Sequence, residues 1–534
     1  MLLPKLVTTL RDYSRAQLVA DLTAGVVVGI VALPLAIAFG IASGATPQAG
    51  LGTAIIAGFL ISALGGSRVQ IGGPTGAFVV IVAGVIHQHG MGGLALATVM
   101  AGVMLIVLGV ARLGGAIKFI PYPVTTGFTT GIALIIFSGQ IRDLLGLRST
   151  VPPGIMDQWL ALFSHRSEWN GLTLLVSGVS LGILVLWPRV SRKVPAPFVA
   201  VVASTVLVQA LHLPVETIGD RFGVITSALP APHLPPISLS LLRELSPAAF
   251  TIAMLAGIES LLSAVVADGM IGSRHRSNME LVALGVANIA SPLFGGIPAT
   301  GAIARTATNV KNGGRTPVAG IVHAVTLLLI TLSLGHWVAL IPMAALAAIL
   351  VVVSYHMCEW RRFLAEFRAP RSDVAVLLVT FLLTLFVDLT VAVEVGMVLA
   401  AFLFMKRMSE VTNINLLTNE FRDAEEDLAD PNATASREIP AGVDVYEIDG
   451  PFFFGAAESF KSAVGSVARR PKVLIIRMRR VPAIDSTGLA ALRDVVRQSR
   501  REGIMVVLSD VHSQPVIAVT NSTLYEELGE ANLT

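Results

Sequence analysis

One carboxylate stands alone in a long apolar stretch of the chain. Between residues 248 and 267, Glu259 is the only ionisable residue, eleven residues into the stretch. Eleven helical residues rise about 16 Å, which is close to the middle of a bilayer. An ionised carboxylate is expensive at that depth, so such residues are usually buried, paired and functional. We interpret Glu259 as a coupling-ion site that takes up and releases a proton, or alternatively ligates Na⁺. The other interpretation is a structural carboxyl that neighbouring hydroxyls, such as those of Ser260 or Ser263, satisfy.

Two short motifs have the composition of a broken helix. Residues 72–77 are Gly-Gly-Pro-Thr-Gly-Ala, and residues 295–302 are Gly-Gly-Ile-Pro-Ala-Thr-Gly-Ala. In each motif a Gly pair leads through Pro to Thr-Gly-Ala and then to a short apolar run. Gly and Pro release the backbone at membrane depth, which is tolerated only inside protein or beside a wet cavity. The alternative is that Gly and Pro are simply frequent in membrane helices, which fits a single motif better than a matching pair.

A half-helix that begins at each motif predicts an anion site. Pro suits the first turn of a helix, where unpaired N–H groups and the positive end of the helix dipole point outward. Together these groups bind anions. From the loop charges described below, the two half-helices run in opposite directions, so their N-termini face each other as in inverted-repeat transporters. The predicted substrate-binding residues of the two motifs are Pro74, Thr75, Gly76, Ala77, Thr300, Gly301 and Ala302.

Arg305 follows the second motif by one helical turn, after an uncharged run from residue 281 to residue 304. At that place its guanidinium would add a fixed positive charge to the anion site, and we include it among the predicted substrate-binding residues. Two alternatives are that the side chain snorkels to the cytoplasm, or that it pairs with Glu259 as an architectural bridge.

The elements that must position these residues are membrane helices. Of the 534 residues 54% are hydrophobic and 14% are charged, whereas an average soluble protein is about 25% charged. This composition indicates a multi-span membrane protein and excludes a mainly disordered chain or a collagen-like fibre. One cysteine, Cys358, excludes an internal disulfide and a cysteine-based metal cage. We expect no metal, no cofactor and no nucleic-acid partner. No nucleophile–base constellation stands out, so we do not expect an enzyme.

Hydropathy and loop charges predict the number and direction of the spans. Residues 22–67 lack Asp, Glu, Lys and Arg, which is enough for two helices of about 20 residues. Alternate loops are rich in Lys and Arg, so the positive-inside rule predicts both termini in the cytoplasm; the basic loop at 142–168 is the exception. Further apolar stretches centre near residues 80, 101, 129, 179, 205, 258, 286, 305, 326, 347, 381 and 399, about fourteen segments in all.

The C-terminal part of the chain has a soluble composition. From residue 440 to residue 534, 22 of 95 residues are charged, compared with 51 of the preceding 439. Strand patterns at 443–448, 473–476 and 505–508 flank a helical pattern at 488–501, which predicts a small α/β domain. We therefore expect a transmembrane domain at 1–408, an acidic linker at 409–439 and a cytosolic domain at 440–534.

These features together resemble the SulP family of anion transporters over nearly the whole chain. The resemblance rests on residues 73–77, on residues 257–262 with 266–269, and on residues 295–305, while residues 440–534 resemble a STAS domain. It implies an α-helical membrane protein with a fourteen-segment, seven-plus-seven inverted repeat, similar to the uracil permease fold. It also implies a core domain that moves against a gate domain, a substrate site between the half-helices that the helix of Glu259 lines, and a homodimer.

The resemblance also bears on coupling. Sodium-coupled bicarbonate members have Asp at the position of Glu259, whereas the Glu form is similar to members thought to be proton-coupled, such as bacterial dicarboxylate and sulfate symporters. We therefore expect a secondary active transporter in the bacterial inner membrane that imports a small anion (sulfate, a C4-dicarboxylate or bicarbonate) with H⁺. A Na⁺-coupled bicarbonate symporter and an anion exchanger or channel remain as alternatives. So does a sensor in which the STAS domain signals the state of transport.

A second resemblance concerns the STAS domain. Residues 485–488, Asp-Ser-Thr-Gly, match the motif of anti-sigma-factor antagonists in which the Ser is phosphorylated. Ser486 is therefore a candidate phosphorylation site. The alternative is a helix cap with no modification.

Overall fold

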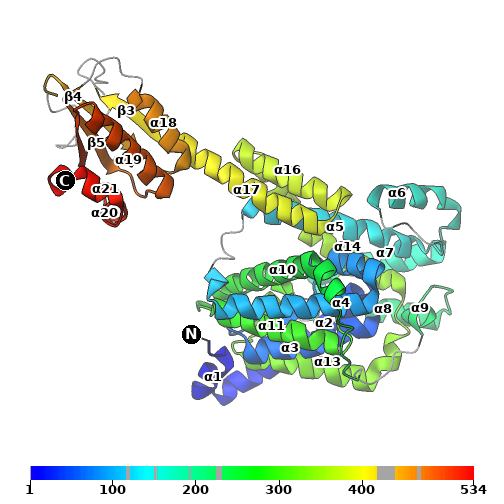
Figure 1. The fold of residues 1–534 in the computed structure, drawn as a ribbon. Coiled ribbons are helices and arrows are strands. Elements are labelled where there is room, and N and C mark those ends of the chain that lie inside the picture. The colour runs from blue at the N-terminus through cyan, green and yellow to red at the C-terminus, as the bar shows by residue number, and fades with distance from the viewer. Residues whose placement is uncertain are drawn as a thin grey trace. The chain divides into compact units, whose positions relative to one another are not determined.

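The computed structural model describes residues 2–115, 121–149, 152, 154–191, 194–223, 231–417, 439–465 and 471–534. The chain divides into two compact units, Met1–Met397 and Val398–Thr534, and each is described by itself (Figure 1). The first unit is helical, and the second combines a sheet with helices.

The first half of the helical unit contains seven apolar segments. A glycine kink at Gly90, with φ 66° and ψ −174°, divides α4 into a half-helix and a full helix, so the six long helices of this half supply seven segments. Short helices α1 (Lys5–Thr9) and η1 (Leu10–Asp12) precede them, α6 (Ile155–Ser164) and η4 (Arg166–Glu168) interrupt them, and α9 (Ile218–Phe222) follows. The main elements are α2 (Arg15–Ala42), α3 (Pro47–Leu64), β1 (Gly72–Gly73), η2 (Gly76–Phe78), α4 (Val79–Val110), α5 (Tyr122–Leu145), α7 (Gly171–Val190) and α8 (Ala196–Ala210).

The second half repeats this order. A long helix pair leads to a two-residue strand, a half-helix and four more helices, with the short α15 (Trp360–Glu366) inserted among them. The elements are α10 (Leu239–Ile271), α11 (Ser277–Leu293), β2 (Thr300–Gly301), α12 (Ile303–Lys311), α13 (Pro317–Val338), α14 (Met343–Met357), α16 (Arg371–Phe386) and α17 (Leu389–Val411).

The packing follows the symmetry of an inverted repeat. In the first group of helices, α2 and α3 of the first repeat pack on α13 of the second. Equivalently, α10 and α11 of the second repeat pack on α4 of the first. A second group holds α5, α7, α14 and α16, in which α16 packs on α5 as α7 packs on α14 (Figure 1). The predicted fold class, an α-helical membrane protein with an inverted repeat, is confirmed. Among the described residues, nine helices are long and apolar enough to cross a membrane, and Ala196–Ala210 is a shorter apolar helix.

Small residues let the two repeats approach closely. A Cβ built on Gly102 of α4 would lie 2.7 Å from the carbonyl oxygen of Gly285 on α11, and a Cβ on Gly285 would lie 2.5 Å from that of Gly102. Any larger residue at either place would separate the two backbones. Polar N-caps start several of the helices, because their side chains accept from orphan N–H groups: Thr46 accepts from the amide of Ala49, and Thr316 accepts from that of Val318.

The C-terminal unit is a four-stranded sheet with helices packed against it. The strand order is β3-β4-β5-β6, with β3 antiparallel to β4 and the other pairs parallel. Its core includes Tyr446, Phe452 and Phe460, whose side chains are buried. The elements are β3 (Asn413–Leu417), β4 (Val443–Asp449), α18 (Phe454–Gly465), β5 (Val473–Arg480), α19 (Ser486–Arg501), β6 (Met505–Ser509), α20 (Ser513–Thr520), α21 (Thr523–Leu528) and η6 (Glu530–Asn532).

The predicted linker at 409–439 differs from the structure in its first part. Helix α17 continues to Val411, and residues 413–417 form β3, an edge strand of the C-terminal sheet. Residues 418–438 of that stretch, including its acidic run, lie outside the described residues. The C-terminal sheet therefore begins before residue 440.

Candidate functional site

The two predicted motifs meet at the strands that precede their helices. Strand β1 pairs with β2 in antiparallel register, with Gly72 opposite Gly301 and Gly73 opposite Thr300. The amide of Ala302 donates to the carbonyl oxygen of Ile71 at 2.8 Å, which extends this pairing. A helix begins directly after each strand, so segments 225 or more residues apart place their helix N-termini on one short antiparallel pair.

Glu259 lies against the first of these helix N-termini. Its Oε2 accepts a hydrogen bond from the Thr75 hydroxyl at 2.9 Å. The two serines considered as its partners bond elsewhere, because Ser260 bonds to Glu280 and Ser263 donates to Thr306 at 3.3 Å. The hydroxyl that bonds to the carboxylate is therefore that of Thr75 in the first motif, and not that of Ser260 or Ser263.

Arg305 reaches from α12 to the first motif. Its side chain is 2% exposed, and its Nη2 donates to the carbonyl oxygen of Pro74. Its Nη1 has no hydrogen-bond partner among the described residues. Arg305 and Glu259 act on each other electrostatically, while Thr75 is the residue bonded to the carboxylate. A snorkelling Arg305 is excluded by this burial, and the guanidinium keeps N–H groups for another acceptor.

Two glycines of the motifs are required by close packing. At Gly73 the backbone φ is 147°, and a Cβ there would lie 2.6 Å from Nη1 of Arg305. A Cβ on Gly301 would lie 1.7 Å from Nε2 of Gln70. Gly76 faces Met357 and Phe39, so α14 and α2 close the beginning of the first half-helix. The structure thus brings all eight predicted substrate residues to the β1–β2 pair and the helices that follow it.

Thr300 is the residue that ties β2 to the helix of Glu259. Its hydroxyl donates to the carbonyl oxygen of Ala256 at 2.8 Å, and its side chain is fully buried. Thr300 therefore fixes the strand against α10 one turn before Glu259, and does not extend its hydroxyl into an open site.

Sequence reasoning missed a second buried carboxylate, Glu280 of α11. Its Oε2 accepts from the amides of Gly66 and Ser67 at 2.8 and 3.0 Å, and its Oε1 accepts from Ser260 at 3.3 Å. Ser260 in turn accepts from Nε2 of Gln70 at 2.6 Å. The network ties the loop before β1 to α10 and α11. The sequence feature that could have indicated Glu280 was an acidic residue in the first turn of an apolar helix.

Replacing Glu280 with Ala is expected to lower the free energy of unfolding by about 3 kcal/mol, because three buried donors lose their acceptor. Glu280→Gln keeps one acceptor oxygen and should cost about half as much. Thermal denaturation of the purified protein in detergent measures both effects. Glu244→Ala is the control, since that carboxylate is 62% exposed on α10. Equal stability of Glu280→Ala and the control would contradict a structural role for the network.

Asp21 of α2 is another fully buried carboxylate, and it lies at the beginning of α13. Its Oδ2 accepts from the hydroxyls of Thr316 and Tyr13 at 2.6 and 3.0 Å, and its Oδ1 accepts from the amide of Arg315 at 2.8 Å. Burial, together with the hydrogen bond to Asp21, raises the pKa of Tyr13 to about 12. These contacts occupy both carboxylate oxygens, which makes Asp21 an architectural residue.

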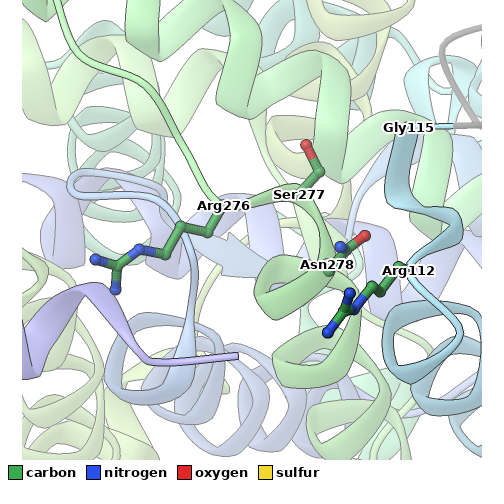
Figure 2. A pocket seen from close by; sticks show the side chains of 5 residues that line it. All are labelled: Arg112, Gly115, Arg276, Ser277 and Asn278. Carbon is green, nitrogen blue, oxygen red and sulfur yellow. The ribbon is translucent and has the colours of Figure 1, made fainter. Parts of the chain in front are cut away.

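A surface pocket lies apart from the two motifs. Five residues at the end of α4 and the beginning of α11 line it, and none belongs to the predicted site: Arg112, Gly115, Arg276, Ser277 and Asn278. In Figure 2 the Arg276 side chain extends away from that of Arg112. Its Nη1 donates to the carbonyl oxygen of Leu3 at 2.6 Å. The pocket therefore gives no reason to place the anion site anywhere other than at the two motifs.

Ser486 lies on the surface of the C-terminal unit. It is exposed at the first position of α19, and Asp485 is the residue that caps this helix, accepting from the amide of Gly488 at 2.7 Å. The helix-cap role considered for Ser486 is therefore performed by its neighbour.

Comparisons with known proteins agree with this architecture. The family model described as "Sulfate permease family" matches residues 18–380, and that of the STAS domain matches residues 434–533. "Putative sulfate transporter YvdB" of Bacillus subtilis (strain 168) is 41% identical over 525 residues, which cover 97% of this chain and 96% of that protein. "Bicarbonate transporter BicA" of Synechocystis is 30% identical over 501 residues, covering 92% of this chain and 87% of that one.

Two solved structures are similar as well. The structure described as "The overall structure of SLC26A9" matches with a TM-score of 0.89 at 19% identity, covering 100% of this chain and 91% of that one, which bears on the fold alone. "The transmembrane domain of a cyanobacterium bicarbonate transporter BicA" matches with a TM-score of 0.64 at 31% identity, covering 75% of this chain and all of that one.

Proposed function

Since this chain belongs to the sulfate permease family of anion transporters, we propose that it imports a small anion together with H⁺ across the bacterial inner membrane. The observation that carries the proposal is a pair of contacts at one place. Arg305 and Pro74 join the two half-helix motifs, and Thr75 of the same motif binds Glu259. A buried cation with a spare N–H and a protonatable carboxyl therefore share the first helix N-terminus.

The anion is held, in this proposal, by backbone N–H groups and by Arg305. The half-helices after β1 and β2 supply N–H groups that have no partner within their own helices, and their dipoles favour negative charge. The guanidinium can donate to a planar or tetrahedral oxyanion through N–H groups that Pro74 leaves free. This arrangement selects charge and size more than chemical identity, so sulfate, a C4-dicarboxylate and bicarbonate all fit the proposed substrate class.

The proton is carried, in this proposal, by Glu259. Protonation removes a negative charge next to the anion site and so favours anion entry, and by linkage a bound anion favours the protonated carboxyl. The Thr75 hydroxyl can donate to the carboxylate, and can also donate to the carbonyl oxygen of the protonated acid. Loss of both ligands on the cytoplasmic side then restores the ionised carboxylate.

Two alternatives use the same residues. In a Na⁺-coupled bicarbonate symporter Glu259 would ligate the cation, and the similarity to a bicarbonate transporter supports bicarbonate as its anion. In an exchanger or channel Glu259 would carry no coupled ion. We further propose that both termini are cytoplasmic, that the protein forms a homodimer, and that Ser486 is accessible to a kinase.

Uptake into proteoliposomes tests the proposal. Labelled sulfate, bicarbonate and fumarate are offered separately, with an acidic exterior or with an inward Na⁺ gradient. We expect one anion to accumulate with the acidic exterior and not with Na⁺ alone. Accumulation that needs Na⁺ would support the symporter alternative, and counterflow without accumulation in either gradient would support an exchanger.

A further inference from the structure

A fully buried histidine lies next to the proposed anion site and has no part in it so far. His323 of α13 is 0% exposed, and within the described part of the chain neither ring nitrogen has a hydrogen-bond partner of ordinary geometry, although the carbonyl of Gly320 lies within reach of the ring. Buried polar atoms are nearly always bonded to protein or to ordered water, so an orphaned imidazole inside a membrane protein requires an explanation.

The imidazole ring borders the strand that Arg305 contacts. A Cβ built on Gly58 of α3 would lie 3.2 Å from the carbonyl oxygen of Gly72 and 3.6 Å from Nδ1 of His323. On the neighbouring residue, a Cβ on Gly73 would lie 2.6 Å from Nη1 of Arg305. Arg305 is also close enough to act on the ring electrostatically. Gly58 thus lies beside both β1 and the imidazole, which places the ring near the strand that precedes the first half-helix.

Two further buried hydroxyls without a hydrogen-bond partner among the described residues lie on α3 and in the loop that follows it. Ser62 of α3, one turn beyond Gly58, has a buried hydroxyl with no hydrogen-bond partner in the residues that the structure describes, and a Cβ built on Gly320 would lie 2.1 Å from it. Ser67, in the loop that follows α3, has a second such hydroxyl. In the proposed orientation this loop is cytoplasmic. Buried unpartnered polar atoms thus lead from Arg305 past His323 and Ser62 towards the cytoplasmic end.

We propose that His323 relays the coupled proton between the anion site and the cytoplasm, along a hydrated path past Ser62. This rests on the proposed proton coupling. The acid form of Glu259 gives its proton to water in the site, the ring accepts a proton from that water on one nitrogen, and it releases a proton from the other nitrogen to water beside Ser62. The ring is neutral before and after the transfer but is left in the opposite tautomer, so a flip of the ring restores the first tautomer before the next proton; a neutral imidazole is both donor and acceptor.

Few other ionisable groups face this path. At its Ser67 end lies Glu280, whose Oε2 accepts from the amides of Gly66 and Ser67 and whose Oε1 accepts from Ser260, so both of its oxygens are engaged. Of the elements packed against α13, α3 has none, α1 supplies Lys5, and α2 supplies Asp21 and the exposed Arg15. Asp21 is fully engaged at the beginning of α13. Arg305 stays protonated at all ordinary pH values and cannot relay a proton. His323 is therefore the group placed to do so.

The first test separates proton movement from anion binding. Full-length protein in liposomes that enclose a pH-sensitive dye is assayed for anion-driven proton influx and for anion counterflow. His323→Gln is expected to reduce proton influx at least tenfold and to leave counterflow within twofold. Thr331→Val, a buried polar change on the same helix, is the control and should alter neither. Unchanged proton influx in His323→Gln, or an equal loss of influx and counterflow, would overturn the relay.

The proposed function has its own outcome in this assay. A wild-type protein that moves the anion without protons overturns the coupling and the relay together. If the wild type moves protons and His323→Gln moves them equally well, the relay alone is overturned.

A second test does not depend on transport. The chain has one cysteine, so Cys358→Ser provides a background for single cysteines. Cysteines at His323 and at Ser62 should react with a small charged thiol reagent in inside-out vesicles, while cysteines at Ala324 and Leu327, buried on the same helix, should not. Absence of reaction at both positions overturns the hydrated path, and Ser62→Cys keeps the test decisive if His323→Cys fails to fold.

Discussion

Glu259→Gln is expected to abolish anion accumulation driven by a pH gradient, lowering its initial rate by at least about 100-fold, which corresponds to about 2.8 kcal/mol at 1.4 kcal/mol per tenfold. Gln has the shape of the protonated acid, and its carbonyl oxygen can still accept from Thr75. It cannot release a proton, so the cycle that returns the empty ionised site is lost. The measurement is uptake into proteoliposomes with an acidic exterior.

Anion binding should respond differently from accumulation. In the wild type, raising the pH is expected to ionise Glu259 and to weaken anion binding, whereas Glu259→Gln mimics the protonated form and should bind the anion with no such pH dependence. Counterflow at several pH values measures this. Glu244→Gln, an exposed carboxylate change on the same helix, should behave as the wild type. Unchanged uptake and pH dependence in Glu259→Gln would falsify the coupling role.

Much of the membrane fold could be predicted because its signals are local. Each of the fourteen apolar stretches corresponds to a helix or half-helix, since about 20 apolar residues are sufficient to indicate a span. The paired motifs were visible for the same reason: Gly, Pro and Thr lie within a few residues of one another at 72–77 and at 295–302. The strand and helix patterns at 443–448 and 488–501 likewise agree with β4 and α19.

The contacts that hold the site could not be predicted, because they join distant residues. Glu280 binds amides 213 and 214 positions away, and Nδ2 of Asn309 donates to the carbonyl oxygen of Val69, 240 positions away. A single sequence contains no local pattern for such pairs. Only the packing of α11 and α12 against the loop before β1 reveals the partners of these two polar residues. Strand β3 was missed for a related reason, because its pairing with β4 crosses an acidic stretch.

Arg305→Gln is expected to raise the KM for the anion by about 100-fold, since removing one partner of a buried charge pair typically costs 2–5 kcal/mol. Gln can still donate to the carbonyl oxygen of Pro74 but supplies no charge. Arg305→Lys should fall between the wild type and Gln, because a single ammonium cannot hold Pro74 and a bidentate anion at once. Lys311→Gln removes the same charge from an exposed position of α12 and should leave KM unchanged.

The same variants distinguish binding from architecture at Arg305. If the guanidinium served only to bridge the half-helices through Pro74, Arg305→Gln would lower thermal stability and leave the KM of the folded fraction at its wild-type value. If it binds the anion, KM rises and saturating anion stabilises the wild type more than the variant, because a ligand stabilises the state it binds. The second outcome is expected, since a bridge alone would not require a charged group with an orphaned N–H at a fully buried position.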